Sequence, residues 1–519
     1  MKLERTKNAS KSAAFGIALR LYQIIIPFVM RTAMVYLMGI EYLGLNSLFT
    51  SILQVLNLAE LGVGSAMVFS MYKSIAEEDE RKICALEKLY QKYYFVIGAV
   101  IAVGGIALTP FIPYLIKGEV PKELNVYVLY LLNLGATVFS YWLFAYKNSL
   151  FQAHQRTDIT SRINIVTVTI QYGLQLFVLW AFHSYYLYVM AMLATQMLTN
   201  IVIAICANKV YPNYQPKGNL SKAEIKEING RIKDLFTAKL GATIVNSADT
   251  IVISAFLGLT VLAMYQNYYF ILSAVMGILQ VFINACLAGI GNSIVTETLD
   301  KNYADFKKLV FIINWIVIVC VACFACMYQP FITLWVGEQY TFEYPIVVLF
   351  CIYFYLVIMQ QVIGLYKDAA GIWHQDRFRP LIASLVNLAL NIVLVGKWGI
   401  YAIVASTLIS YLAVAIPWMI SNVFTYVFKR SAKEYIFITL KNVVACTAVT
   451  AITIMVCGFV HTDKLFVRLV INSIICCLLP NVLLWCIYKN NENYYQMLNY
   501  IGRLMPGRIQ RIFLNILKR

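Results

Sequence analysis

The sequence has little charge and little histidine. Of its 519 residues, 13% are charged and four are histidines, and 42 lysines and arginines outnumber 25 acidic residues. Soluble domains carry about 25% charged residues, so the composition excludes an ordinary soluble protein. The sequence also lacks a phosphate-binding glycine loop and a recognisable catalytic triad. We therefore expect that the protein is not an enzyme.

Apolar sequence is abundant instead. Hydrophobic residues make up 61% of the chain and the mean hydropathy is +0.71. Roughly 20 apolar residues suffice to cross the hydrocarbon core of a bilayer as a helix, so we predict an all-α polytopic membrane protein with about 14 transmembrane helices. The predicted spans are residues 13–38, 44–71, 91–116, 124–147, 163–182, 185–207, 236–257, 260–290, 308–328, 343–366, 380–396, 399–422, 439–460 and 466–488.

The basic residues lie mostly on one side of the predicted membrane spans. A formal net charge of +17 would suit a nucleic-acid partner, but most lysines and arginines fall in segments on one side of the predicted spans. By the positive-inside rule, this distribution predicts that both termini are cytoplasmic. We expect a multi-pass protein of the plasma membrane, with no nucleic-acid partner.

The first predicted helix carries two arginines within an apolar run, Arg20 and Arg31. Eleven residues of α-helix return to the same face about 16 Å further along the axis. An arginine at mid-membrane usually faces protein or a water-filled cavity. We predict that this face lines a cavity that receives an anion; the alternatives are that each arginine snorkels to the nearer interface or joins a structural ion pair.

Two further helices carry candidate substrate-binding residues. Glu60 stands near a polar face of the second predicted helix, where a lone carboxylate needs a cation or a proton. Gln280 and Asn284 lie along one face of the eighth. For neutral side chains, cavity lining and hydrogen bonding between helices are both open interpretations.

The two halves of the chain match each other at a nearly constant offset. Tyr146-Lys147 recurs 220 residues later as Tyr366-Lys367, and a shift of 219 residues places Arg20 on Lys239. Six helices in each half indicate an internal duplication, with two lobes around a central cavity that Lys239 could also face.

This pattern predicts five segments. Between the halves, Ser221-x-x-Glu224 forms a capping box that starts an amphipathic helix. The segments are residues 1–207, an N-terminal six-helix lobe; 208–235, a cytoplasmic linker; 236–422, a C-terminal six-helix lobe; 423–488, helices 13 and 14; and 489–519, a cytoplasmic basic amphipathic tail.

The twelve cysteines lie mostly in apolar runs. Cys320, Cys323 and Cys326 have metal-like spacing, but they fall in a predicted membrane helix without nearby histidine or acidic residues. We interpret them as small apolar packing residues rather than metal ligands.

Two stretches carry a family resemblance. The sequence from Leu58 to Ala66, with Glu60, Gly62 and Gly64, resembles the second-helix signature of Wzx-type oligosaccharide flippases. The stretch from Tyr366 to Asn391 resembles their tenth and eleventh helices. The resemblance implies a flippase that moves undecaprenyl-diphosphate-linked oligosaccharides from the inner to the outer leaflet of the bacterial plasma membrane. Polysaccharide polymerase and glycosyltransferases would be its partners.

The resemblance also suggests a coupling ion. In the related lipid II flippases a sodium site lies between helices seven, eleven and twelve, and matching positions here hold Asp249, Asn387, Asn391 and Thr407, with the carbonyl of Ile403. One carboxylate with neutral oxygens suits a monovalent hard cation. Asn391 replaces a second acid of those relatives, so structural hydrogen bonding is an equal alternative. We expect no cofactor beyond Na⁺ or H⁺ as the coupling ion.

Three other functions fit parts of the pattern. A cation-coupled multidrug antiporter or a lipid II flippase could use the same fold; the antiporter would prefer an acidic cavity, which the two arginines disfavour. A polymerase or ligase would need large outer loops with carboxylates or histidines, and the predicted outer segments are short.

Overall fold

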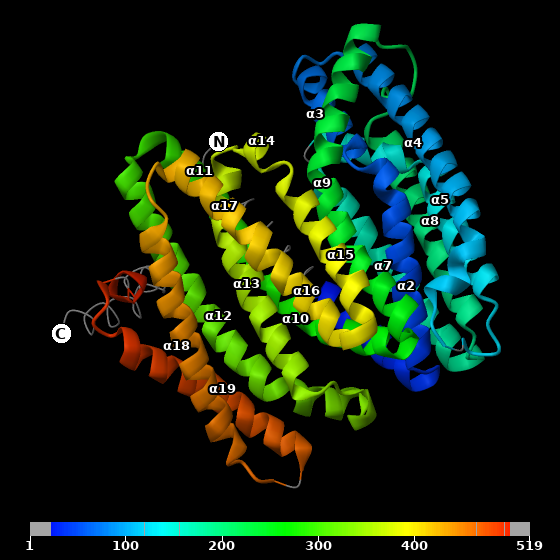
Figure 1. Cartoon of the computed structure of the whole chain (residues 1–519). Helices are drawn as coiled ribbons and strands as arrows, with labels where there is room; N and C mark the ends of the chain where they lie inside the picture. Colours follow the sequence, from blue (N-terminus) through cyan, green and yellow to red (C-terminus); the bar gives the residue numbers. More distant parts are fainter. Residues whose placement is uncertain (1–21, 119, 155, 463, 493, 499–519) are drawn as a thin grey trace, which may run out of the picture. The chain divides into compact units, whose positions relative to one another are not determined.

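The computed structural model describes residues 22–118, 120–154, 156–462, 464–492 and 494–498, apart from a few side chains within helices (Figure 1). The contacts divide the chain into two compact units. Unit 1 comprises Met1–Gln266 and Leu388–Ile400, and unit 2 comprises Asn267–Asn387 and Tyr401–Arg519.

All the regular structure in the described part of the chain is helical. Within the described residues, eleven helices are long and apolar enough to cross a membrane, and a twelfth span arises if Val126–Trp142 and Ala145–Ala153, bent by 51°, count as one. Two shorter apolar helices cover Tyr22–Leu37 and Ser247–Leu257. The predicted all-α polytopic fold is confirmed, whereas the count of fourteen spans stays a prediction.

Unit 1 is a bundle of long helices that begin at polar caps. Asp79 accepts a hydrogen bond from the Lys82 amide, and Asn125 accepts one from the Tyr127 amide, so each satisfies backbone donors at a helix start. Within the bundle, α2 packs on α9, α4 on α5, and α7 on α8. The labelled elements are α2 (Ile40–Leu56), η1 (Asn57–Glu60), α3 (Val63–Ala76), α4 (Glu80–Leu108), η2 (Thr109–Leu115), α5 (Val126–Trp142), η3 (Ala145–Lys147), α6 (Asn148–Ala153), α7 (Thr157–Phe182), α8 (Tyr185–Val210) and α9 (Lys222–Leu257).

The helix after Ser221 differs from its predicted length. The capping box is confirmed, because the Ser221 hydroxyl accepts from the Glu224 amide and the Glu224 carboxylate accepts from the Ser221 amide. However, α9 continues without a break to Leu257 and joins the linker helix to the predicted seventh span. The sequence contains no proline in this stretch, and a single helical glycine such as Gly230 costs only about 1 kcal/mol.

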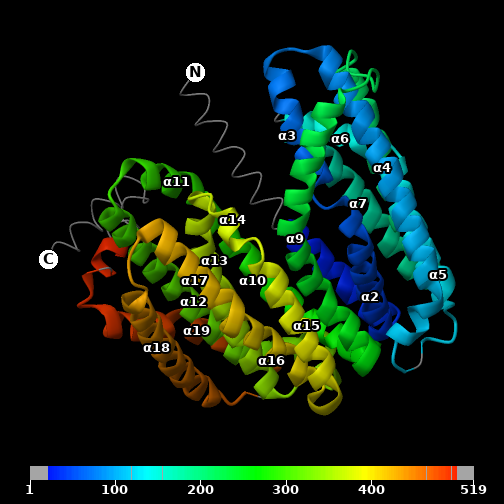
Figure 2. The ribbon, with the colours of Figure 1, turned by 45° about the horizontal axis from the view of Figure 1, so that its top comes forward.

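Unit 2 holds the remaining long helices. In it α18 and α19 both pack against α12 (Figures 1 and 2). Its core includes an aromatic cluster around Phe306, which contacts Tyr303, Tyr366, Phe424 and Phe428. The elements are α11 (Leu287–Thr296), α12 (Leu299–Val336), η4 (Glu338–Tyr340), α13 (Tyr344–Ala369), α14 (Trp373–Asp376), α16 (Ile400–Ser410), the π-helical segments η5 (Tyr411–Ala415) and η6 (Val423–Phe428), α17 (Ile416–Asn422), α18 (Lys433–Gly458) and α19 (Leu465–Tyr488); α10 (Leu259–Ala285) and α15 (Arg379–Trp398) contribute residues to both units.

Candidate functional site

The Leu58–Ala66 motif breaks the second predicted span. The 3₁₀ turn η1 ends at Glu60, and Gly62 precedes α3 with φ of +89°, a conformation that L side chains rarely adopt. A Cβ at Gly62 would stand 2.8 Å from the Cβ of Leu235 and 3.0 Å from the carbonyl oxygen of Ile232 on α9. The glycine therefore permits both the break between η1 and α3 and the close approach of α9.

This break exposes Glu60 to a polar pocket in unit 1. The pocket has a volume of about 310 Å³ and is lined by Glu60 together with Tyr90 and Tyr94 of α4 and polar residues of α6. The Tyr94 hydroxyl donates to Glu60 Oε1 at 3.0 Å, and the Tyr90 hydroxyl donates to that of Tyr94 at 2.7 Å. A Cβ at Gly64 would meet the Tyr90 hydroxyl at 3.0 Å, so the second motif glycine keeps room for this chain of hydroxyls.

A buried ion pair lies beside the same pocket. Lys147 Nζ is 3.4 Å from Glu87 Oε2, and their side chains are 3% and 0% exposed. Ser149, which lines the pocket, places its hydroxyl 3.0 Å from Glu87 Oε1, and Lys147 also donates to the carbonyl of Tyr214. The sequence does not predict the contact between Glu87 and Lys147, because sixty residues separate them. The signal that was available is the polar dipeptide Tyr146-Lys147 at the end of a predicted span, which indicates that Lys147 needs a partner.

Unit 2 contains a second polar pocket, of about 270 Å³. The predicted residues Gln280 and Asn284 line it together, and the Gln280 amide donates to Asn284 Oδ1 at 2.7 Å. The other polar lining residues are Gln360, Gln361, Lys367, Asp368 and Arg379.

Charges around this second pocket are paired. Arg379 forms a bidentate contact with Asp376, at 2.8 Å and 2.9 Å. Lys367 Nζ lies 2.9 Å from Asp368 and 3.5 Å from Asp376. Two cations thus face two carboxylates, and the amides supply neutral donors and acceptors suited to hydroxyl-rich ligands.

The four residues of the predicted cation site form two hydrogen-bonded pairs. In unit 1, the Asn391 amide donates to Asp249 Oδ1 at 2.6 Å, and both side chains are buried. In unit 2, the Asn387 amide donates to Thr407 Oγ1 at 2.9 Å, and Thr407 donates to the carbonyl of Ile403 at 3.1 Å. The cation-binding role of these four residues stays a prediction.

The predicted cationic residues are only partly described. Arg31 lies half-buried on the helix Tyr22–Leu37, near enough to Tyr188 of α8 for an electrostatic interaction. Arg20 lies outside the described residues, and so does the side chain of Lys239 on α9. The predicted anion-binding role of the three stays a prediction.

Gln54 of α2 and Asn57 of η1 accept hydrogen bonds from neighbouring helices. Ser247 donates to Gln54, and Tyr141 donates to Asn57, each at 3.3 Å. Both contacts are side-chain hydrogen bonds between neighbouring helical segments.

The fold is shared with solved transporters. A structure described as lipid II flippase MurJ in an inward closed conformation matches with a TM-score of 0.69 and 15% identity over 92% of this chain and 99% of that one. An inward-facing multidrug resistance MATE family transporter of the MOP superfamily matches with a TM-score of 0.60 and 13% identity, over 78% and 95%. A eukaryotic MATE transporter gives 0.53 and 11%, over 80% and 98%. These likenesses show the fold.

Sequence comparison shows the family. A search of curated protein sequences found no match. A family model described as "Polysaccharide biosynthesis protein" matches residues 10–288, more than half of the chain. The chain therefore belongs to the polysaccharide biosynthesis protein family, as its resemblance to Wzx-type flippases predicts.

Proposed function

We propose that the protein is a flippase for undecaprenyl-diphosphate-linked oligosaccharide repeat units. It moves them by alternating access from the inner to the outer leaflet of the bacterial plasma membrane, for surface polysaccharide assembly. Both termini are cytoplasmic, and glycosyltransferases and a polymerase act before and after it.

One observation carries the proposal. A chain whose family is named for polysaccharide biosynthesis has the fold of a lipid II flippase over 92% of its length. The name of that structure states lipid II as its substrate. The substrate that we propose for this chain also has a lipid carrier, but it differs from lipid II in the attached glycan.

The candidate residues fit such a substrate chemically. A diphosphate needs several donors, which Arg20, Arg31 and Lys239 would supply, and guanidinium groups can bind its oxygens in pairs. Gln280 and Asn284 present amides of the kind that bind sugar hydroxyls. If the interior is about 100 mV negative, outward movement of two negative charges is favoured by roughly 4 to 5 kcal/mol.

The direct test is reconstitution. The purified chain in liposomes, supplied with a fluorescent polyprenyl-diphosphate oligosaccharide, should equalise the label between leaflets within minutes, as measured by a quencher that cannot cross the bilayer. Protein-free liposomes are the blank. Absence of flipping for every polyprenyl-diphosphate glycan tested would contradict the proposal, and efflux of cationic dyes without flipping would favour the multidrug antiporter.

Arg31 provides the matched variants. Arg31→Ala should lower the flipping rate by about tenfold or more, since it removes a charge-assisted donor, whereas Arg31→Lys should retain part of the rate because it keeps the charge without the planar fork. Equal protein levels and unfolding temperatures in detergent would show that insertion is intact. A full rate in Arg31→Ala would remove Arg31 from the proposed site.

A further inference from the structure

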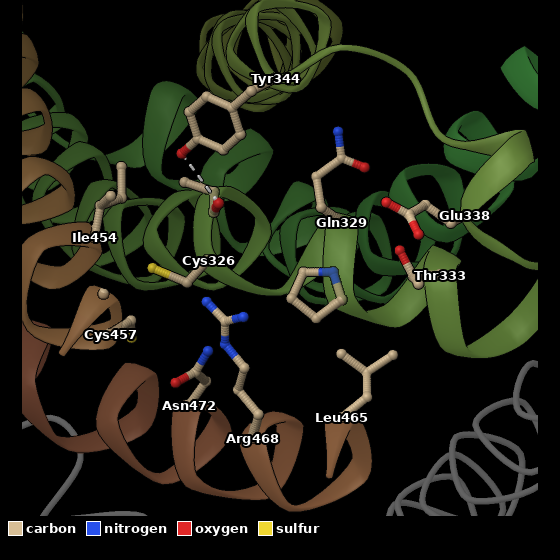
Figure 3. A pocket seen from close by; sticks show the side chains of 13 residues that line it. Cys326, Gln329, Thr333, Glu338, Tyr344, Ile454, Cys457, Leu465, Arg468 and Asn472 are labelled. Atoms are coloured by element: carbon tan, nitrogen blue, oxygen red, sulfur yellow. Dashed lines mark hydrogen bonds between the residues drawn. The ribbon is translucent and has the colours of Figure 1, made fainter. Parts of the chain in front are cut away.

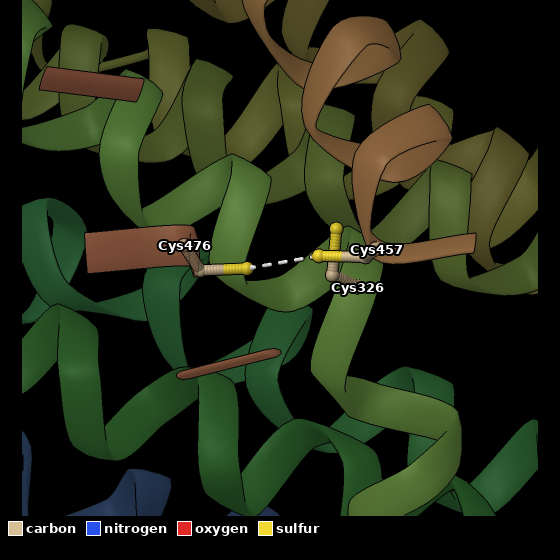
Figure 4. A group of neighbouring side chains, drawn as sticks. All are labelled: Cys326, Cys457 and Cys476. Carbon is tan, nitrogen blue, oxygen red and sulfur yellow. Dashed lines mark hydrogen bonds between the residues drawn. The ribbon is translucent and has the colours of Figure 1, made fainter. Parts of the chain in front are cut away.

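Three cysteines from three helices meet inside unit 2. Cys326 comes from α12, Cys457 from α18 and Cys476 from α19, and their sulfur atoms all lie within 4.8 Å of one another (Figure 4). Cys457 and Cys476 are 4% and 0% exposed. Only Cys326 belongs to the CxxCxxC stretch of the sequence; Cys457 and Cys476 come from α18 and α19.

The spacing of the sulfurs suits a bound metal ion. A metal–thiolate bond of about 2.3 Å in a trigonal planar site places neighbouring sulfurs about 4.0 Å apart. The Cys457 and Cys476 sulfurs are 3.9 Å apart. Competing contacts are weak, because Cys476 reaches the carbonyl of Ala322 only at 3.9 Å. Small side-chain adjustments would bring the three sulfurs around one ion.

A cavity gives access to this cluster. It has a volume of about 420 Å³, and its lining includes Cys326 and Cys457 as well as Arg468 and Asn472 of α19. In Figure 3, Arg468 and Asn472 project from α19 into the space in front of Cys326. Arg468, Asn472 and Cys476 follow one another at intervals of four residues, which places them along one face of the helix.

Two buried polar atoms on this face of α19 have no hydrogen-bond partner among the described residues. Asn472 is 2% exposed, and its Oδ1 has no hydrogen-bond partner among the described residues; the same holds for the buried Nε of Arg468. Buried polar atoms are rarely left unsatisfied without a reason. Three thiolates holding one monovalent ion would carry two net negative charges, and the guanidinium of Arg468 would offset one of them.

We propose that Cys326, Cys457 and Cys476 form a three-coordinate site for a soft monovalent metal ion of the copper(I) class. Soft thiolate ligands select such ions. Binding exchanges S–H bonds for metal–sulfur bonds and releases the thiol protons, without any change in oxidation state. Because the ligands come from three helices, a bound ion would join α18 and α19 to α12.

The ligand set argues against zinc. Structural zinc sites are almost always tetrahedral with four protein ligands, whereas three sulfurs meet here within 4.8 Å of one another. Cys323 also contacts Cys476, but its thiol donates to the Cys476 carbonyl at 3.8 Å and lies outside this group of three. Three soft donors suit copper(I) better. Zinc binding is therefore an outcome that the test must distinguish.

The test uses the purified full-length chain in detergent, under anaerobic conditions with a phosphine reductant. Copper(I) is titrated against a chromogenic copper(I) chelator. We expect one ion per chain, and X-ray absorption should show three sulfur ligands at about 2.3 Å. Loss of a residue that only holds a metal ligand in place weakens metal binding 10–100-fold. Cys457→Ser removes a ligand itself, so it should weaken copper(I) binding at least as much.

The neighbouring Cys477 provides the matched control. It lies next to Cys476 on α19 but is exposed, so Cys477→Ser should bind copper(I) as the original chain does. The absence of stoichiometric copper(I) binding, nitrogen or oxygen ligands in the absorption spectrum, undiminished binding by the Cys326/Cys457/Cys476→Ser triple variant, or a preference for zinc would each overturn the proposal. The spectrum needs no variant, so it decides the matter even if the triple variant fails to fold.

Discussion

At the scale of single residues, the Glu87–Lys147 pair shows how buried charge is stabilised in unit 1. Both side chains are almost fully buried, and Ser149 and the carbonyl of Tyr214 complete their contacts. Two desolvated charges gain little net stability from each other, but removal of one partner leaves the other uncompensated. The pair should therefore be sensitive to single substitutions and tolerant of a double one.

Lys147→Met should destabilise the protein by about 3 to 5 kcal/mol, because Glu87 loses its cation in a buried site. The Lys147→Met/Glu87→Gln double variant should recover most of that loss. Thermal unfolding in detergent measures both. Lys73, whose ion pair with Glu77 is largely exposed, is the control, and Lys73→Met should change stability by less than about 1 kcal/mol. Equal shifts for the Lys147 and Lys73 variants would refute the argument.

Two variants can separate the effect of the negative charge of Glu60 from the effect of its hydrogen bond with Tyr94. Glu60→Gln keeps an oxygen that can accept from Tyr94 but removes the negative charge, whereas Tyr94→Phe removes the donor and keeps the charge. If the charge serves transport, Glu60→Gln should lower the flipping rate about tenfold or more and Tyr94→Phe should lower it less. A Glu60→Gln protein that flips at the full rate would leave Glu60 with a structural role alone.

At the scale of elements, the sequence predicted helices better than their breaks. Apolar runs predicted the long helices, and the Ser221 capping box predicted where α9 begins, because both signals are local. The break at Gly62 inside the second predicted span depends on α9, whose Ile232 and Leu235 approach the glycine. Such a tertiary contact leaves no mark on hydrophobic periodicity.

Gly62→Ala tests this break. The new Cβ would meet α9 at 2.8 Å while the backbone holds φ of +89°, so we expect a loss of about 2 kcal/mol, from positive-φ strain and the clash together. Gly230→Ala on α9 is the control, since nothing lies within 4 Å of its Cβ, and it should be neutral or stabilising by up to about 1 kcal/mol. Unfolding temperatures that rank the two variants in the opposite order would contradict the account.

At the scale of the whole molecule, the internal duplication stays a prediction, and two of its matched residues can be compared. Lys147 and Lys367 occupy equivalent places in the predicted duplication, and each meets a buried carboxylate within its own unit, Glu87 or Asp376. The motif glycines and the matched Tyr-Lys pairs are visible in the sequence. The partners of these lysines are not, because side-chain pairing between distant segments follows from packing rather than from periodicity.

Coupling to an ion is also a property of the whole transport cycle. An ion drives the cycle only if it binds one conformation more tightly than another, since equal affinity for both shifts nothing. Asp249 is the one carboxylate among the four predicted ligands, and Asn391 already donates to it. Its charge would attract a cation, and its removal should abolish coupling.

Asp249→Asn should therefore slow flipping and eliminate any dependence on a sodium gradient, while substrate binding survives. The measurement is flipping in liposomes with sodium and pH gradients set independently, and Asn387→Ala serves as the comparison because it removes a neutral ligand only. If flipping by the original chain depends on the sodium gradient and flipping by Asp249→Asn does not, Asp249 is a ligand of the coupling ion. Dependence on pH alone would indicate proton coupling. Full activity of Asp249→Asn without dependence on either gradient would make the Asp249–Asn391 contact purely structural, and the membrane potential acting on the diphosphate would then be the driving force.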